Sequence, residues 1–388
     1  MDAHQRLAKH IVDLPKSGIR EFFDIVSTRK DVVSLAIGEP DFDTPWHIRE
    51  AAMFSLEQGA THYTGNAGLL ELRQAIARYV RQTFGGDYDP AHEVLVTVGA
   101  SEGIDITLRA LLNPGDEVLY HEPCFVSYAP EITMAHGVPV VVETHAEDHF
   151  KLSIEALEAK ITPRTKALLI NFPNNPTGAI LEQADIEAIA DFAERHDLIV
   201  LSDEIYAELT WGGKKHVSLA SLPKMKERLV LFHGYSKAWA MTGFRMAYIC
   251  APQWMMDTIL KIHQYALMCA STASQRAALE AMRQPEEDMA PMLRAYELRR
   301  NFLSAAFADA EIPMQTPAGA FYAFPSIAKF GLTAREFAVR LLDSENVAVV
   351  PGTAFGKCGE GFVRCSYATG MEQLKEAAVR MARFVKGL

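Results

Sequence analysis

The chain has 388 residues, of which 49% are hydrophobic and 22% are charged, and this composition is typical of a globular protein. Its length exceeds one ordinary compact core, so two domains are expected. The formal net charge is −11 and the basic residues form no cluster, which argues against binding to nucleic acid or to an anionic membrane.

The sequence also bears on where the protein works. The N-terminal stretch MDAHQRLAKHIVDLPKSG lacks the apolar core of a signal peptide. No apolar run approaches the roughly 18 residues that span a bilayer. The five cysteines form no C-x-x-C pair, and several lie inside apolar segments. We therefore expect a cytoplasmic protein.

Short apolar runs and helical patterns alternate from about residue 93 to residue 251. The runs predict strands at 93–99, 117–122, 138–144, 166–172, 198–204 and 228–234. Helices are predicted between them, for example at 101–112 and 183–197, the second with an apolar face that includes Ile186 and Ile189. Runs that are apolar on both faces and alternate with helices indicate a doubly wound α/β domain with a mostly parallel sheet.

The pattern changes after residue 285, where a long charged helix at about 286–309 leads into shorter strands and a final helix. We predict a large α/β domain over residues 46–285. Residues 1–45 and 286–388 are predicted to form a smaller α+β domain with an N-terminal arm. Within that arm, SGIREFF (17–23) is either a mobile segment that closes over a substrate or a packed helix.

Doubly wound sheets bind ligands at the carboxyl ends of their strands, so the residues that follow each strand are the candidates for a site. GASEGI (99–104) turns a strand into a helix, and free N–H groups at a helix start suit a phosphate. NFPNNPTGA (171–179) must form a tight, shaped loop. Asp203 ends an apolar strand, where an acid must be paired or neutralised, and Tyr206 follows it. Taken singly, these could be an N-cap serine, a turn and a helix-capping aspartate.

Lys237 is the most informative residue, because it follows the last apolar run and lies among small and apolar residues in GYSKAWAMTGFR (234–245). A desolvated lysine has a lowered pKa and is a good nucleophile. Alone, it could pack its stem and reach solvent with its ammonium. Together with Asp203, Arg245 and the phosphate-type turn, it calls for a cofactor with an aldehyde, a basic ring nitrogen and a phosphate. Pyridoxal 5′-phosphate (PLP) has all three.

The sequence also resembles class I aminotransferases of PLP-transferase fold type I, in the subgroup of prokaryotic aspartate, aromatic and acyl-diaminopimelate aminotransferases. The resemblance covers nearly the whole chain and is carried by SLAIGEPDFDTP (34–45), THYTGNAGLLELRQAIARY (61–79), VTVGASEGI (96–104), NNPTGA (174–179), LSDEIYAELT (201–210), GYSKAWAMTGFR (234–245) and VVPGTAFGKCGEGFVRCSYAT (349–369). It implies a seven-stranded sheet in the large domain and a homodimer with shared active sites.

The resemblance assigns roles around the cofactor ring. It implies that Lys237 forms a Schiff base with PLP and then moves a proton between the substrate Cα and C4′. Asp203 keeps the pyridine nitrogen protonated. Tyr206 and Asn175 hydrogen-bond the ring oxygen, and Phe125 stacks on the ring.

The resemblance also assigns the phosphate and substrate contacts. The implied phosphate-binding groups are Ala100, Ser101, Ser236 and Arg245. Tyr63 is implied to reach the phosphate from the neighbouring subunit. Arg364 resembles the arginine that binds the substrate carboxylate in a bidentate manner, with Asn175 and the backbone of Gly38 close to the same carboxylate.

The expected reaction is a ping-pong transamination from an L-amino acid, with aromatic donors favoured, to a 2-oxo acid such as 2-oxoglutarate. N-acetyl-diaminopimelate and aspartate remain alternative donors. The aspartate alternative is weakened because Ser101 stands where relatives that act on acidic substrates can carry a lysine. A PLP-dependent carbon–sulfur lyase and a non-catalytic, cofactor-sensing regulator are further alternatives from other classes.

Three smaller features complete the interpretation. HAEDH (145–149) is interpreted as a polar loop, because its two histidines lack a third metal ligand, and no metal is expected. HQY (263–265) is interpreted as helix surface or a dimer contact. The Asn175–Pro176 peptide bond is expected to be cis, by resemblance.

Overall fold

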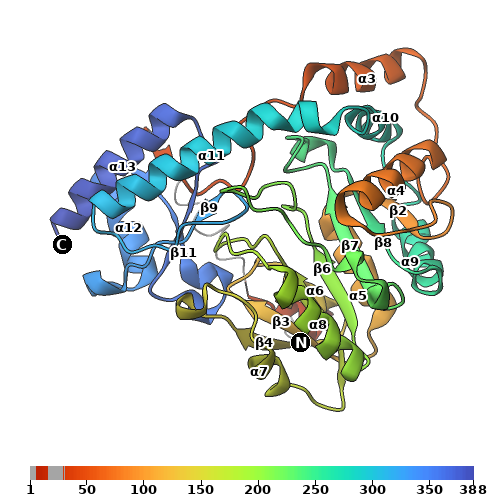
Figure 1. The fold of residues 1–388 in the computed structure, drawn as a ribbon, viewed down its shortest axis with the longest axis horizontal. Helices are drawn as coiled ribbons and strands as arrows, with labels where there is room; N and C mark the ends of the chain where they lie inside the picture. Colours follow the sequence, from red (N-terminus) through yellow and green to blue (C-terminus); the bar gives the residue numbers. More distant parts are fainter. Residues whose placement is uncertain (1–5, 16–28, 30) are drawn as a thin grey trace.

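The computed structural model describes residues 6–15, 29 and 31–388, so the predicted arm at 17–23 lies outside the described residues. A seven-stranded sheet lies at the centre of the larger part of the chain, as predicted (Figure 1). Its order is β2 (Val94–Thr97), β8 (Ala247–Cys250), β7 (Leu229–Gly234), β6 (Ile199–Asp203), β5 (Thr165–Asn171), β3 (Glu117–Glu122) and β4 (Val138–Glu143). Strand β8 runs antiparallel to both of its neighbours, β2 and β7, and the other adjacent pairs of this sheet are parallel.

Successive side chains of the central strands point into different core layers, as the two-residue period of a strand requires. On β5, Ala167 and Leu169 pack in one layer, whereas Leu168 and Ile170 pack in the other. The helices of the first layer are α5 (Gly99–Leu111), α6 (Tyr128–Met134) and α9 (Gln253–Ala266), and those of the second are α7 (Ile154–Glu158) and α8 (Gln183–Arg195). This burial on both faces explains why the strands are apolar without alternation.

Two strands of the sheet differ from the sequence-based expectation. The valine-rich run at 138–144 is predicted to be buried on both faces. Instead, β4 is an edge strand of the sheet, and its first residue, Val138, is 42% exposed. The run is apolar because its middle residues still face α6 and α7. Strand β8 is not among the six predicted runs, since its four residues give too short a pattern between Arg245 and α9.

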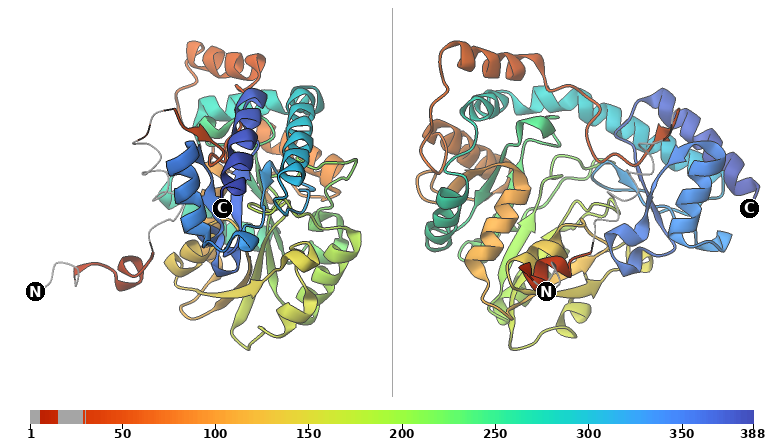
Figure 2. Two further views of the ribbon diagram at one scale, coloured as in Figure 1. Left: turned by 90° about the vertical axis from the view of Figure 1, so that its left-hand side faces the viewer. Right: turned by 180° about the vertical axis from the view of Figure 1, so that it is seen from behind.

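The remaining strands form two small sheets, one with the order β11-β12-β9 and one that pairs β1 with β10. Helix α11 runs from the neighbourhood of the large sheet to these small sheets (Figures 1 and 2). The strands are β1 (Val33–Ser34), β9 (Tyr322–Ala323), β10 (Val347–Ala348), β11 (Val350–Pro351) and β12 (Val363–Ser366). Among the described residues, the helices outside the two core layers are α1 (Lys9–Val12), α3 (Trp46–Glu57), α4 (Leu70–Phe84), α10 (Thr272–Ala281), α11 (Pro285–Asp309), α12 (Ala334–Glu345) and α13 (Met371–Lys386). The domain division at 45/46 and 285/286 stays a prediction.

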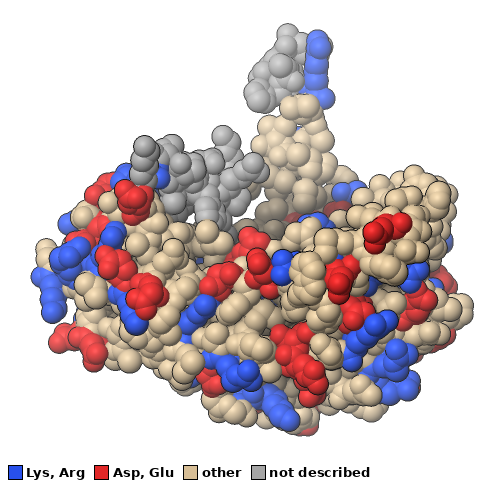
Figure 3. All heavy atoms as spheres, turned by 90° about the horizontal axis from the view of Figure 1, so that it is seen from above, with Lys and Arg blue, Asp and Glu red and all other residues tan. Residues whose placement is uncertain are grey.

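The surface carries charges of both signs. On the face shown in Figure 3, Lys and Arg side chains are interspersed with Asp and Glu side chains. Among the described residues, no helix has the length and apolar character needed to cross a bilayer.

The core assignment can be tested at Leu201, which is fully buried in the middle of β6. Replacing Leu201 with Ala leaves a cavity, so the free energy of unfolding is expected to fall by about 2–5 kcal/mol. Leu298→Ala on α11 is the control, because Leu298 is 64% exposed and its loss should change that free energy by less than about 0.5 kcal/mol. Urea unfolding at one fixed protein concentration measures both. Equal effects of the two substitutions would contradict the assigned core.

Candidate active site

The residues predicted to form the site meet in one pocket of about 330 Å³. Its lining contains Gly38, Ala100, Ser101, Phe125, Asn175, Asp203, Tyr206, Ser236, Lys237, Arg245 and Arg364. Tyr63 is the exception, because its side chain is 79% exposed and does not line the pocket of its own chain.

The sheet register brings these residues together. Asn171 at the end of β5 lies opposite Asp203 at the end of β6, and Asp203 lies opposite Phe232 of β7. Asn175 lies in the loop that follows β5, and Lys237 follows β7 by three residues. Because parallel strands end at the same edge of a sheet, residues far apart in the sequence share one pocket.

The Lys237 amine lies against backbone and aromatic rings inside this pocket. Its Nζ donates a hydrogen bond to the Gly38 carbonyl oxygen over 2.8 Å and lies 5.7 Å from the centroid of the Tyr206 ring. Burial, followed by the nearby charge of Arg364, lowers the pKa of Lys237 to about 8. Roughly a tenth of the amine is therefore neutral at pH 7, far more than for a solvated lysine.

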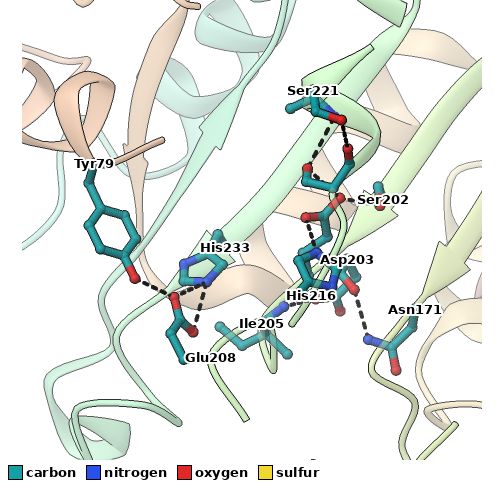
Figure 4. A network of polar contacts seen from close by, with 12 residues as sticks. Tyr79, Asn171, Ser202, Asp203, Ile205, Glu208, His216, Ser221 and His233 are labelled. Carbon is teal, nitrogen blue, oxygen red and sulfur yellow. Dashed lines mark hydrogen bonds and ion pairs between the residues drawn. The ribbon is translucent and has the colours of Figure 1, made fainter. Parts of the chain in front are cut away.

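Asp203 is a buried acid held by two hydrogen bonds. Its Oδ2 accepts from the Tyr128 hydroxyl at 2.7 Å, and its Oδ1 accepts from the Ile205 N–H at 3.1 Å. Burial raises the pKa of Asp203, and these two hydrogen bonds oppose that rise. The Asn171 side chain donates to the Asp203 carbonyl oxygen at 2.9 Å and so fixes the backbone at the strand end (Figure 4).

A second buried acid, Glu208, lies near Asp203 (Figure 4). It accepts hydrogen bonds from the Tyr79 hydroxyl at 2.6 Å and is paired with His233 Nε2 at 3.0 Å. Burial would raise the pKa of Glu208, but His233 and the Tyr79 hydroxyl outweigh it and hold that pKa below its usual value. His233 also opposes the rise that burial causes in the pKa of Asp203, so one imidazole acts on both carboxylates.

Arg364 is a buried cation with unused hydrogen-bonding capacity. Its Nη1 donates to Asn175 Oδ1 at 3.0 Å and its Nη2 donates to the Ala36 carbonyl oxygen at 2.6 Å. Its Nε has no hydrogen-bond partner among the described residues. Burial lowers the pKa of Arg364. A planar guanidinium with spare donors at a pocket wall suits a carboxylate.

The turn before α5 fits against Arg245. Gly99 has φ +78°, and a Cβ on Gly99 would overlap the Arg245 guanidinium. The first N–H groups of α5, those of Ala100 and Ser101 included, have no partner within the helix. A guanidinium beside a helix N-terminus forms a cradle for a dianion such as a phosphate.

His263 packs against this turn, contrary to the prediction that HQY (263–265) forms helix surface or a dimer contact. His263 is fully buried, and its Nδ1 is 2.5 Å from Glu102 Oε1, while Glu102 Oε2 accepts from the Val98 N–H. Gln264 and Tyr265 are exposed as predicted, Tyr265 at 87%. The prediction is wrong for His263 because its partner lies 161 residues away on another helix.

Sequence reasoning assigned no role to four further polar residues of the lining: Tyr128, Asn171, Thr242 and Tyr322. Tyr128 stands three residues after Phe125, and Asn171 opens the predicted loop, so both lay beside recognised motifs. Tyr322, in GAFYAF, comes from β9 of the small sheet and had no such signal. The Asn175–Pro176 bond is cis, as predicted, and so are the Glu122–Pro123 and Phe172–Pro173 bonds.

The donor set fits PLP. A nucleophilic amine faces the pocket at Lys237, and a buried carboxylate at Asp203 can pair with a protonated ring nitrogen. The guanidinium of Arg245 and the start of α5 suit a phosphate, and the guanidinium of Arg364 at the pocket wall suits a substrate carboxylate. Each functional group of the cofactor thus meets a complementary group of the chain.

Comparisons with known proteins agree with this chemistry. The family model described as aminotransferase class I and II matches residues 30–381. The chain is 50% identical to the putative aminotransferase YugH of Bacillus subtilis, over 98% of each chain. It is 46% identical to an aspartate aminotransferase of Pyrococcus abyssi, over 95% of this chain and 96% of that one.

Among solved structures, an aromatic aminotransferase from Pyrococcus horikoshii OT3 superposes with a TM-score of 0.91 at 45% identity. The match covers 94% of this chain and 99% of that one. Family, relatives and site chemistry lead to one conclusion: the chain belongs to the class I and II aminotransferases and is a PLP-dependent transaminase.

Proposed function

We propose that this transaminase transfers the amino group of an aromatic L-amino acid to 2-oxoglutarate in a ping-pong reaction. The observation that carries the choice of donor is the charge of the pocket lining. Among the described lining residues the cations are Lys237, Arg245 and Arg364, and the roles proposed below use all three.

The bound cofactor supplies an aldehyde that takes up the amino group and a ring that withdraws electrons from the substrate Cα. The neutral amine of Lys237 acts as the base that takes the Cα proton. Asp203, as an anion, keeps a proton on the ring nitrogen, and Tyr128 and Ile205 hold its carboxylate in place.

The other residues bind and orient. Tyr206 and Asn175 hydrogen-bond the ring oxygen, and Phe125 packs on the ring. The phosphate is held by Ala100, Ser101, Ser236 and Arg245. Arg364 holds the substrate α-carboxylate with its free donors, close to Asn175 and the Gly38 backbone, so that the Cα proton faces Lys237.

The rest of the lining favours an apolar or aromatic side chain on the substrate. Ile104, Phe125 and Ile205 are apolar, and Tyr322 offers a ring. By resemblance, Ser101 occupies the position at which relatives that act on acidic substrates can carry a lysine. Aspartate is the second candidate donor, since an aspartate aminotransferase of Pyrococcus abyssi is 46% identical to this chain. N-acetyl-diaminopimelate is the third.

We further propose a homodimer in which Tyr63 contacts the phosphate bound in the partner subunit. Large exposed apolar side chains gather on α3, namely Trp46, Met53, Phe54 and Leu56. The loop that carries Tyr63 adjoins Met268, which is also exposed, through a hydrogen bond from Asn66 to the Met268 carbonyl oxygen. An exposed apolar surface of this kind favours burial against a second copy of the chain.

The proposed donor predicts that the first half of the reaction, transfer of the amino group from tyrosine to the enzyme, occurs without an acceptor. Mixing the PLP-loaded protein with tyrosine and no acceptor should change the visible absorbance of the bound cofactor, because the amino group stays on the enzyme. Adding 2-oxoglutarate should reverse the change. Aspartate and N-acetyl-diaminopimelate serve as comparison donors under the same conditions.

A change with aspartate or N-acetyl-diaminopimelate but none with tyrosine would replace the proposed donor. Release of pyruvate and ammonia without any acceptor acid would indicate the lyase alternative instead.

The lowered pKa of Lys237 predicts how fast the cofactor-free protein captures PLP. Only the neutral amine attacks an aldehyde, so the capture rate should rise about tenfold per pH unit below pH 8 and level off above it. Stopped-flow absorbance measures this rate, with Lys237→Ala as the control that should show no capture. A midpoint near 10.5, the ordinary value for lysine, would contradict a desolvated amine.

The shared site predicts complementation between two defective variants. A hybrid dimer of Lys237→Ala and Tyr63→Ala chains, isolated with two different tags, has one site with both residues intact. It should show about half of the wild-type activity without added PLP, whereas each parent dimer has two damaged sites. If Tyr63 served its own chain, the hybrid would instead show no more than half of the activity of the Tyr63→Ala dimer.

A further inference from the structure

Tyr322 of β9 connects two functional groups of the pocket. Its side chain is fully buried, and its hydroxyl oxygen lies 2.9 Å from that of Tyr206. The centroid of its ring lies 4.5 Å from the guanidinium carbon of Arg364. Tyr322 is therefore in contact with the residue proposed to bind the ring oxygen and with the residue proposed to bind the substrate carboxylate.

The position of Tyr322 is fixed by the small sheet and by close packing. It pairs with Ser366 of β12, two residues after Arg364, so Arg364 and Ser366 lie on the same face of that strand. The Tyr322 hydroxyl lies only 2.6 Å from the place that a Cβ on Gly38 would take. Gly38 thus leaves room for the hydroxyl, while its carbonyl oxygen accepts from Lys237.

The hydrogen bond between the two phenols can run in either direction, and the direction matters. A phenol carries one proton, so it donates one hydrogen bond. If Tyr206 donates to Tyr322, it has no proton left for the cofactor ring oxygen. If Tyr322 donates, the proton of Tyr206 stays available for that oxygen.

The surroundings favour donation by Tyr322. Burial raises the pKa of both phenols, but the adjacent Arg364 is the largest opposing influence on the pKa of Tyr322. For Tyr206, burial and then Tyr322 itself raise the pKa, and the lowering effect of Arg364 is smaller than either of these two. The phenol closer to the cation holds its proton less tightly and is the better donor.

We propose that Tyr322 is a positioning residue that donates its hydroxyl proton to Tyr206 and thereby directs the single proton of Tyr206 at the ring oxygen of PLP. This inference rests on the proposed role of Tyr206. Two hydrogen bonds in series polarise each other, so the first also strengthens the second.

The test is a pH titration of the visible absorption of the PLP-loaded protein. Donation by Tyr206 stabilises the ionised ring oxygen, so weakening that bond should raise the midpoint of the colour change. Tyr322→Phe keeps the ring beside Arg364 and removes only the hydroxyl. The midpoint is expected to rise by a few tenths of a pH unit. A lower midpoint would mean that Tyr322 accepts rather than donates, and an unchanged midpoint would mean that it does not position Tyr206. Either result overturns the inference.

Two further variants separate this inference from the proposed function. Tyr206→Phe should raise the midpoint more than Tyr322→Phe, and adding Tyr322→Phe to it should change nothing further, because Tyr322 acts through Tyr206. If Tyr206→Phe leaves the midpoint unchanged, the proposed role of Tyr206 fails and the inference fails with it. If Tyr206→Phe raises the midpoint and Tyr322→Phe does not, only the inference fails.

Tyr367→Phe is the matched control. Tyr367 is also fully buried, and its hydroxyl donates to the Ala320 carbonyl oxygen at 2.9 Å, but it does not line the pocket. Its loss should leave the midpoint where it is in the wild type. An equal shift in Tyr367→Phe and Tyr322→Phe would assign the effect to general loosening and overturn the inference.

Discussion

The parallel register of β5, β6 and β7 is the constraint on which the rest of the site depends. Asn171, Asp203 and Phe232 stand level across these strands, so the loops that follow start from one edge. Because side chains alternate between faces, a slip of one residue in β6 would turn Asp203 away from the pocket. The apolar core residues that set the register of β6 therefore also determine that the Asp203 carboxylate points into the pocket.

The second constraint is the number of charged side chains that meet in the pocket at this edge of the sheet. The chain supplies three cationic groups to the pocket, at Lys237, Arg245 and Arg364, and one carboxylate at Asp203. Charges removed from water are costly unless they are paired. Of the three cations, the amine gives up its charge most readily, and the lowered pKa of Lys237 is the result. In the proposed function, an anionic phosphate would compensate the guanidinium of Arg245 and an anionic substrate that of Arg364.

Much of this arrangement could be predicted from the sequence, because it follows from local patterns. The strands around Asp203 and Lys237 are continuous apolar runs, and a lysine or an acid at the end of such a run is conspicuous. Gly99 and Asn175 stand in turns of unusual composition. The resemblance to a known family added roles that the pattern alone left open, such as that of Arg364.

Contacts between segments that are distant in the sequence could not be predicted. Tyr322 lies in a short strand of a different sheet, and its partner Tyr206 is 116 residues away. His263 belongs to a helix whose apolar stripe gives no sign that one polar member is paired with Glu102. The valines at 138–144 look like a central strand, since hydrophobicity does not reveal whether a second neighbour exists. Such features depend on the three-dimensional arrangement.

The contact between Gly99 and Arg245 has a consequence for how this sequence can diverge. Any side chain at position 99 would need both an unfavourable positive φ and the space that the guanidinium fills. A shorter residue at 245 would free that space but remove the cation beside the helix start. A side chain at 99 would displace that cation and also carry the backbone strain of a positive φ. Positions 99 and 245, separated by 146 residues (245 − 99), thus share one space, so a change at either alters the surroundings of the other.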